Sequence, residues 1–372
     1  MRELAETTGS GLVVTGACYS RGDQLELQAR IVDPWLDEVR QSFGAVRAPA
    51  SDPSPAVEEL SQLVAGTLAL HFANLVPLGL TRAIPLEAVK EFVGTMEISD
   101  SDPRVFISRV NRALEIDPEF HLARYQLVRF YLWGAMPDEA EDQVEVLEGR
   151  LPDMSRYDRS LAHAARARLE RRPLDVLKAL REAVDLAPNA FWARNRIGSW
   201  AIGTNRPREA VEALDGFPFD WTFGSAGFIQ RPFVNLCFAH HMLGNDEAVL
   251  ALAAKSLEHF PNAVIFYGLQ ANALGVMGRF EEMNEVLEES LAIRWHTRTS
   301  AGVSLTYTAR ELRAHGYREQ SLDLAERAVA WFRERPEEIR QEPLFYSAAL
   351  CAAERWREAH EVVERLATEK PD

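Results

Sequence analysis

The side chains with the clearest chemical potential are six arginines between Arg156 and Arg172, in a chain whose formal net charge is −15. Asp158 and Glu170 are the acidic residues of that segment, so its local charge is +4. A guanidinium group binds a carboxylate through two parallel hydrogen bonds. Two interpretations are open: the segment binds an acidic peptide or a terminal carboxylate, or its arginines only neutralise acidic faces of neighbouring helices.

Residue types that carry catalysis are not grouped in a recognisable way. His240 and His241 are adjacent, and adjacent side chains on a helix diverge by about 100°, so the two cannot share a metal ion without help. The acidic runs 138–148 and 281–289 have the pattern of solvated helix faces. Phosphate-binding loops, kinase motifs, the metalloprotease His-Glu-x-x-His and the hydrolase Gly-x-Ser-x-Gly are absent. We therefore expect no enzyme activity, no cofactor and no metal site.

The elements that must position these side chains recur at a fixed period. Gly244 opens the segment Gly-Asn-Asp-Glu-Ala, and 34 residues later Gly278 opens Gly-Arg-Phe-Glu-Glu. At about twice that period, Asp138-Glu-Ala140 is followed 70 residues later by Arg208-Glu-Ala210. A period of 34–35 residues that contains two amphipathic helices is the signature of a tetratricopeptide (TPR) array. Over about residues 100–370 the chain therefore resembles tetratricopeptide proteins.

This resemblance implies a mainly α fold, with a TPR-like right-handed α-solenoid of about seven helical hairpins over residues 85–372. Prolines and glycines that close helices set the register of the pairs. The pairs are expected at 120–134 with 137–147, 156–171 with 173–186, 191–204 with 207–214, 232–243 with 246–260, 263–277 with 280–293, and near 301–332 and 338–369.

In tetratricopeptide geometry the first helix of each pair lines a concave groove. The candidate groove residues are therefore side chains about one turn apart on those helices. They are Tyr125, Arg129, Arg159, His163, Arg166, Trp192, Asn195, Arg231 and His241. Such a groove suits an acidic peptide or protein partner. The lysine and asparagine clamp of chaperone-binding tetratricopeptide domains is not reproduced.

Each helix also needs a small side chain where it approaches its neighbour closely. On first helices we assign this position to Ala162, Gly198, Cys237 and Ala271, and on second helices to Ala140, Ala210 and Ala359. Residues 215–230 interrupt the array with five aromatic side chains, namely Phe217, Phe219, Trp221, Phe223 and Phe228. This aromatic loop is either a lid over a ligand or a cap on the neighbouring helices.

Residues 1–80 follow a different period and are expected to form a small α/β module. A β-favouring run from Leu12 to Tyr19 is followed by a turn and by strict alternation from Gln24 to Ile31, which predicts a β-hairpin. A third strand is expected at 39–47, and a helix follows the proline-rich segment 48–55.

Two segments of this module, Leu4–Gly16 and Arg21–Asp33, resemble the second half of a TolB-type N-terminal module. That module carries a helix, a glycine, a strand, a hairpin and a strand in this order, and its opening strand and helix are missing here. Such modules are fused to tetratricopeptide arrays in bacterial serine/threonine kinases, adenylate cyclases and transcriptional activators. The resemblance implies a bacterial signalling protein and a truncated module.

Composition narrows the classes of function and location that remain. The net charge of −15 argues against binding to nucleic acid, and no run of 18 apolar residues predicts membrane insertion. Cys18, Cys237 and Cys351 are too far apart for a cysteine-based zinc motif. We expect a cytoplasmic location if Met1 is the true start, and an extracytoplasmic one if the chain is part of a membrane-anchored protein.

The sequence thus predicts a non-enzymatic protein-interaction scaffold, the docking or sensory part of a bacterial signalling system. The alternative is a detached regulatory domain or subunit of a serine/threonine kinase or adenylate cyclase. A hydrolase or lyase within the solenoid is a third hypothesis, and it would need titratable groups that converge in a closed pocket.

Overall fold

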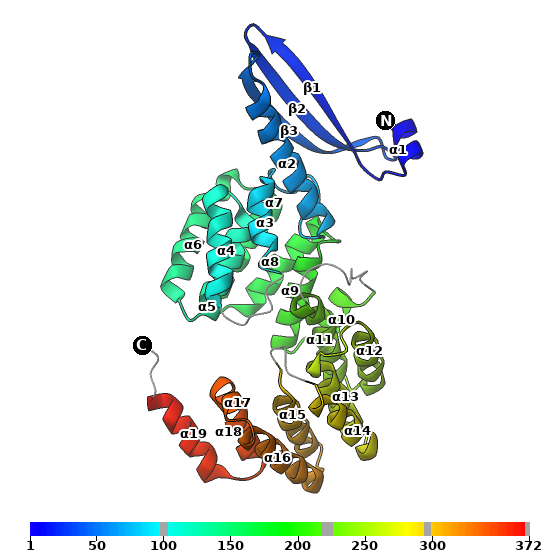
Figure 1. The fold of residues 1–372 in the computed structure, drawn as a ribbon, viewed down its shortest axis with the longest axis vertical. Coiled ribbons are helices and arrows are strands. Elements are labelled where there is room, and N and C mark those ends of the chain that lie inside the picture. The colour runs from blue at the N-terminus through cyan, green and yellow to red at the C-terminus, as the bar shows by residue number, and fades with distance from the viewer. Residues whose placement is uncertain (97–102, 217–225, 294–298, 369–372) are drawn as a thin grey trace. The chain divides into compact units, whose positions relative to one another are not determined.

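The computed structural model describes residues 1–96, 103–216, 226–293 and 299–368. These residues form two compact units. The first comprises residues 1–204 and 226–228, and the second comprises residues 205–216 and the chain from Ile229 onward. Figure 1 shows a small sheet at the N-terminus followed by helices alone. The predicted fold class, mainly α with a small N-terminal α/β part, is confirmed.

The sheet has three antiparallel strands in the order β1-β2-β3. After helix α1 (Arg2–Thr8), strands β1 (Val13–Arg21) and β2 (Gln24–Asp33) form the expected hairpin. Gly22 turns the chain between them with a φ of +66°, a left-handed conformation that glycine adopts without strain. Strand β3 (Glu38–Pro49) completes the sheet on the other side of β2.

Helix α2 (Ser54–Phe72) covers one face of the sheet, where it packs on β2 and β3. The alternating residues of β2 point toward it, and Ala29 and Ile31 are buried there together with Phe43 of β3. Glu26 of β2 lies on the other face, where its Oε2 is 3.1 Å from Arg47 Nε of β3. The hydrophobic alternation therefore sets which face of the sheet α2 occupies.

Helices make up the rest of the first unit, and consecutive helices pack on one another. They are α3 (Leu86–Val93), α4 (Pro103–Ile116), α5 (His121–Trp133), α6 (Pro137–Gly149), the short 3₁₀ helix η1 (Leu151–Asp153), α7 (Arg156–Leu169), α8 (Pro173–Leu186) and α9 (Phe191–Gly203). The pairs α5/α6 and α7/α8 match the expected ranges to within about two residues.

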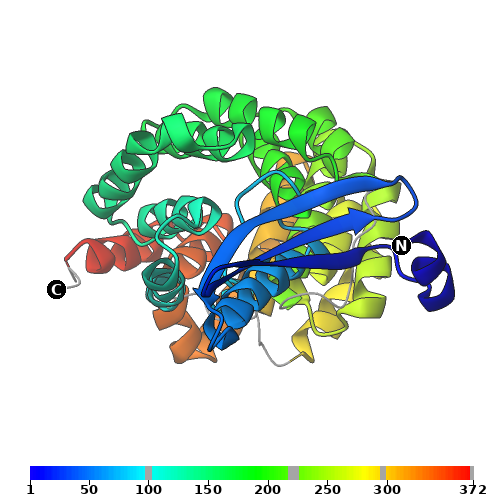
Figure 2. The same cartoon turned by 90° about the horizontal axis from the view of Figure 1, so that it is seen from above.

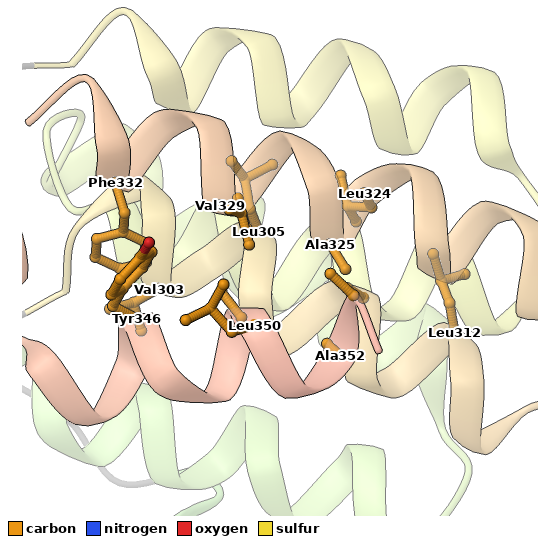
Figure 3. Close-up of a cluster of buried hydrophobic side chains, with 14 of the residues drawn as sticks. Val303, Leu305, Leu312, Leu324, Ala325, Val329, Phe332, Tyr346, Leu350 and Ala352 are labelled. Carbon is orange, nitrogen blue, oxygen red and sulfur yellow. The ribbon is translucent and has the colours of Figure 1, made fainter. Parts of the chain in front are cut away.

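The second unit continues the series. Its helices are α10 (Pro207–Leu214), α11 (Ala226–Met242), α12 (Asp246–His259), α13 (Val264–Val276), α14 (Phe280–Leu291), α15 (Ala301–Ala314), α16 (Arg318–Arg333), α17 (Pro336–Gln341), α18 (Pro343–Ala352) and α19 (Trp356–Thr368). Side chains of α15, α16 and α18 meet in one buried cluster, which includes Leu305, Val329 and Leu350 (Figure 3).

One backbone feature repeats at every turn between the two helices of a pair. The residue there is left-handed in seven places, at Ala135, Arg171, Asn205, Gly244, Gly278, Gly316 and Glu354. At six of them the next amide donates to the carbonyl five residues back, as Asn245 N does to His240 O at 2.9 Å. This is the Schellman motif, which ends a helix by satisfying its last carbonyls. Glycine fills the left-handed position in three of the seven turns, and glycines of this kind are the landmarks visible in the sequence.

The left-handed residue gives each first helix a common register. Seven residues before it stand Val128, Ala164, Gly198, Cys237, Ala271, Ala309 and Ser347, and all of them are buried. Three of the four positions expected to carry a small side chain fall in this register. The fourth, Ala162, is buried too, but Ala164 is the residue in the equivalent position. The predicted small-residue position in α7 is therefore two residues too early.

The sheet module and the helices of the first unit are joined by the connection that follows α2. Leu75 is fully buried, Asn74 O accepts a hydrogen bond from Phe191 N at 3.0 Å, and Tyr157 Oη lies 3.5 Å from Leu75 O. The connection thus covers the start of α7 and the start of α9. Among the described helices, none is both long and apolar enough to cross a membrane.

Candidate peptide-binding face

A helix cap fixes the start of α7 and so the direction of its side chains. Ser155 is the N-cap: its Oγ accepts a hydrogen bond from Asp158 N at 3.0 Å and donates one to Asp158 Oδ2 at 2.8 Å. The first of these hydrogen bonds satisfies a backbone N–H that a helix start would otherwise leave free. Burial raises the pKa of the Asp158 carboxyl to about 6. Its role in the cap accounts for this buried carboxyl without a substrate.

Arg156, Arg159 and His163 form one stripe on α7, which we call the basic face. They are three and four residues apart, so they project from the same side of the helix over about 10 Å. Arg156 and His163 are exposed, and Arg159 is half-buried. In the described part of the chain, neither Arg156 nor Arg159 has an ion pair, a side-chain hydrogen bond or an aromatic contact. Both guanidinium groups are available to a ligand.

Arg166 continues the stripe by one turn, but acidic side chains of α6 surround it. Its Nε and Nη2 donate to the two carboxylate oxygens of Glu148 at 2.9 and 2.6 Å, and its Nη1 donates to Glu141 at 2.7 Å. These hydrogen bonds raise the pKa of Arg166 and lower that of Glu148. Arg166 therefore holds α7 against α6.

The other arginines of the segment also fall into two groups, those that contact neighbouring side chains and those that face solvent. The Arg168 guanidinium lies 5.4 Å from the centre of the Trp200 ring, and Arg172 contacts Glu170 and Asp175. Arg171, the left-handed residue of its turn, is exposed. Both interpretations of the basic segment thus apply to different members of it: some arginines hold helices together, and others face solvent.

The aromatic and amide candidates of α5 and α9 are brought together in the core. Tyr125 and Trp192 are each 1% exposed, and their rings meet edge to face with centroids 5.0 Å apart. Asn195 is buried on the same helix as Trp192. Arg129 is half-buried, with its Nε bonded to Gln126 and its guanidinium 4.3 Å from the Phe130 ring centre. These side chains pack within the unit rather than line an open surface.

Arg231 and His241 belong to α11. Arg231 is exposed. His241 lies between two carboxylates, with Nδ1 3.1 Å from Asp246 and Nε2 3.1 Å from Glu311, and the hydrogen bond to Glu311 raises the pKa of His241. The same carboxyl of Glu311 lies 3.1 Å from His315 Nε2. His241 therefore ties α11 to α12 and α15.

The remaining predictions from the sequence have different outcomes. His240 does not share the surroundings of His241, since its ring nitrogen lies 3.5 Å from Asn245 Nδ2. In the described ranges no group of three or more His, Cys, Asp or Glu side chains is arranged so that it could hold a metal ion. Phe217, Phe219, Trp221 and Phe223 of the aromatic loop lie outside the described residues. The periodicity that located Arg159 and His163 also fits Arg156, which is missing from the predicted groove.

The seven turns described above share one geometry and are 34–39 residues apart. The basic face therefore belongs to a protein built of repeats. The fold is a TPR-like α-solenoid. No protein-family model matches the chain, and no curated protein matches it. The APC/C hetero-tetramer Cut9–Hcn1 aligns at 12% identity with a TM-score of 0.45, over 75% of this chain and 54% of that one. The chain therefore spans about half the length of that neighbour.

Two further solved structures are similar. A tetratricopeptide repeat protein from Parabacteroides merdae aligns at 12% identity with a TM-score of 0.40, over 71% of this chain and 99% of that one. The C-terminal part of a TPR repeat-containing protein from Cytophaga hutchinsonii aligns at 13% identity with a TM-score of 0.33, over 74% and 98% of the two chains.

Proposed function

We propose that this chain is a non-enzymatic docking scaffold whose basic face binds an acidic segment of a protein partner. The observation that carries the proposal is the pair Arg156 and Arg159, which have no partner among the described residues while Arg166 on the same helix is fully engaged. Ion pairs between neighbouring helices therefore do not account for these two arginines.

The spacing of the basic face suits one kind of ligand. Arg156 and His163 are about 10 Å apart along the helix axis, because seven residues rise by 1.5 Å each. A polyproline II segment has three residues per turn and rises by about 9 Å in that turn. Carboxylates at every third residue of such a segment therefore lie on one side, at a spacing close to that of the basic face.

A peptide with the sequence Glu-Pro-Pro-Glu-Pro-Pro-Glu is the probe for this proposal, with its glutamine counterpart as the control. We expect fluorescence anisotropy to show binding of the glutamate peptide that weakens steeply with salt, since the contacts are ionic. The glutamine peptide should not bind. Equal binding of the two peptides, or no binding of the glutamate peptide, contradicts the proposal.

The double variant Arg156→Ala/Arg159→Ala tests the site itself. We expect it to weaken binding of the glutamate peptide at least tenfold, because each bidentate contact between arginine and carboxylate is lost. Arg171→Ala is the matched control, since Arg171 is exposed on the same segment but lies at the turn after α7. Its affinity should stay within about twofold of wild type. An equal loss in both variants would assign binding to net charge alone.

The finer part of the proposal is that this scaffold is a docking or sensory part of a bacterial signalling system. Its support is the resemblance of the first 72 residues to TolB-type modules. We expect affinity purification from the native bacterium to recover a kinase or a cyclase with the chain, and to lose it in the Arg156→Ala/Arg159→Ala variant. Recovery of partners with no signalling enzyme among them contradicts this part and leaves the peptide experiment unaffected.

A further inference from the structure

Strand β1 has a neighbouring strand of the sheet on one side only, and it is exposed from Gly16 onward. Helix α2 packs mainly on β2 and β3, and burial in β1 is confined to its start, where Val13 is buried and Thr15 is half-buried. Val14 and Tyr19, which point to opposite faces, are 47% and 51% exposed, and every residue from Gly16 to Arg21 is exposed. Figure 2 shows β1 as an outermost strand of the sheet. Its outward amide and carbonyl groups form a template for another strand.

The two edges of the sheet differ in how they are protected. The outer strand on the other side, β3, carries Glu38, Arg40 and Arg47, ends at Pro49, and pairs with β2 through two register shifts. Charges, proline and irregular pairing are the usual means by which proteins prevent edge pairing. Strand β1 has none of them: it pairs with β2 without a register shift and has no charge from Val13 to Ser20.

We propose that two copies of this chain associate through antiparallel pairing of β1 with β1, about a two-fold axis that passes through Ala17. This register places Thr15 opposite Tyr19 of the second copy, and Gly16 opposite Cys18. Aromatic side chains opposite β-branched ones are favourable cross-strand pairs. The two sheets then form one sheet of six strands, with both α2 helices on the same face.

The absence of acidic residues from β1 favours a second copy of this chain as the partner strand. Two chains of net charge −15 repel one another over most of their surfaces, but β1 contains no acidic residue. Its one charge, Arg21, lies at the strand end. In the antiparallel register that end meets the start of the other β1, which follows α1 and its exposed Glu3 and Glu6. Within the paired residues 13–21, this register therefore brings no like charges opposite one another.

The mass of the full chain in solution tests the pairing. Light scattering should give twice the 41.9 kDa of one chain at micromolar concentration. Ala17→Lys places two lysines side by side on the axis, and Ala17→Glu does the same with carboxylates, so each variant alone should be monomeric. An equimolar mixture of the two should restore the dimer. Ala17 is exposed, so each variant alone should remain folded, with a circular dichroism spectrum like that of wild type.

Gln24→Lys is the matched control, because it adds the same charge to the exposed hairpin end of β2 instead of the edge. It should remain dimeric. A wild-type chain that is monomeric at all concentrations overturns the proposal. A dimer that survives both Ala17 variants overturns it as well, since the copies would then meet elsewhere.

A disulfide gives an independent measurement of the register. Directly opposed residues of antiparallel strands have Cα atoms about 4.5–5.5 Å apart, within the range that a disulfide spans. Ala17→Cys in a Cys18→Ser background should form a covalent dimer under mild oxidation, and Cys18→Ser alone should not. The other cysteines are buried Cys237 and half-buried Cys351. Equal cross-linking in the two variants contradicts the register.

Discussion

At the scale of single residues, Arg159 and Arg166 have different roles although they lie two turns apart on one helix. Arg159 has no partner in the described residues, whereas Arg166 makes hydrogen bonds to Glu148 and Glu141 and is only 23% exposed. Charge-assisted hydrogen bonds from a half-buried guanidinium are worth more than an exposed ion pair. The two arginines should therefore separate binding from stability.

Replacing each arginine by alanine tests this separation. Arg166→Ala should lower the free energy of unfolding by about 1–2 kcal/mol, because two carboxylates of α6 lose their partner. Arg159→Ala should cost less than about 0.5 kcal/mol, because Arg159 makes no ion pair or side-chain hydrogen bond among the described residues. Thermal or urea unfolding followed by circular dichroism provides the comparison. Equal costs for the two variants would mean that Arg159 also holds helices together.

His241 gives a prediction for pH. Its pKa in the folded chain is raised by the hydrogen bonds to Glu311 and Asp246, so the folded state binds the proton more tightly than the unfolded state does. The stabilisation is complete below the unfolded pKa of about 6.5 and is lost as pH rises through the folded value. The free energy of unfolding of wild type should therefore fall over this window.

His241→Asn should remove most of that fall, and His163→Asn, at an exposed position of α7, should leave it unchanged. Urea unfolding at several pH values between about 5 and 9 is the measurement. Since His241 is only partly buried, the effect should be about 1 kcal/mol or less. The account of this ion pair fails if the two histidine variants have the same pH profile.

At the scale of elements, the repeated turn explains why some repeats were visible in the sequence and others were not. Gly244 and Gly278 mark their turns because glycine is the residue expected in a left-handed conformation. Ala135, Arg171 and Glu354 adopt the same conformation without such a signature. The turn is imposed there by packing of the two helices, so local sequence preference could not reveal it.

Replacing alanine by glycine, and glycine by alanine, at these turns gives the next prediction. A left-handed conformation costs a non-glycine residue roughly 1–2 kcal/mol, and glycine costs somewhat more entropy on folding. Ala135→Gly should therefore be neutral or stabilise the chain by up to about 1 kcal/mol, and Gly244→Ala should destabilise it by about 1 kcal/mol. No atom lies within 4 Å of a Cβ added at Gly244, so its cost reports backbone strain alone. Melting temperatures that move in the same direction would contradict the shared turn.

Gly66 tests how the sheet module is attached. A Cβ added there would overlap Ile84 O and come within 2.8 Å of Leu86 N and 2.9 Å of Pro85 C, all of which are backbone atoms that cannot turn away. Gly66→Ala should cost roughly 1–3 kcal/mol, as overpacking does. Gly149, at the end of α6, has no neighbour within 4 Å of such a Cβ, so Gly149→Ala is the control. Equal stability of the two variants would show that α2 does not need this close approach.

At the scale of the whole molecule, the period of 34–35 residues was sufficient to predict the helical pairs, because each pair repeats one local pattern of helix, turn and helix. The candidate site was harder to predict from the sequence. Tyr125, Trp192 and Asn195 were expected on an open groove, but they are buried. The connection after α2 covers the starts of α7 and α9. One of these contacts joins Leu75 to Tyr157, which are 82 positions apart in the sequence. A local repeat period cannot reveal a contact over such a distance along the chain.

The central claim is that the basic face of α7 is where this scaffold holds an acidic partner. Photo-cross-linking tests it most directly: the glutamate peptide, with a benzophenone at its end, is irradiated with the full chain, and mass spectrometry of the digest locates the adducts. We predict adducts on α7 between Arg156 and Leu169 that excess unlabelled peptide abolishes and that the Arg156→Ala/Arg159→Ala variant lacks. Adducts confined to other helices, or unchanged in that variant, would contradict it.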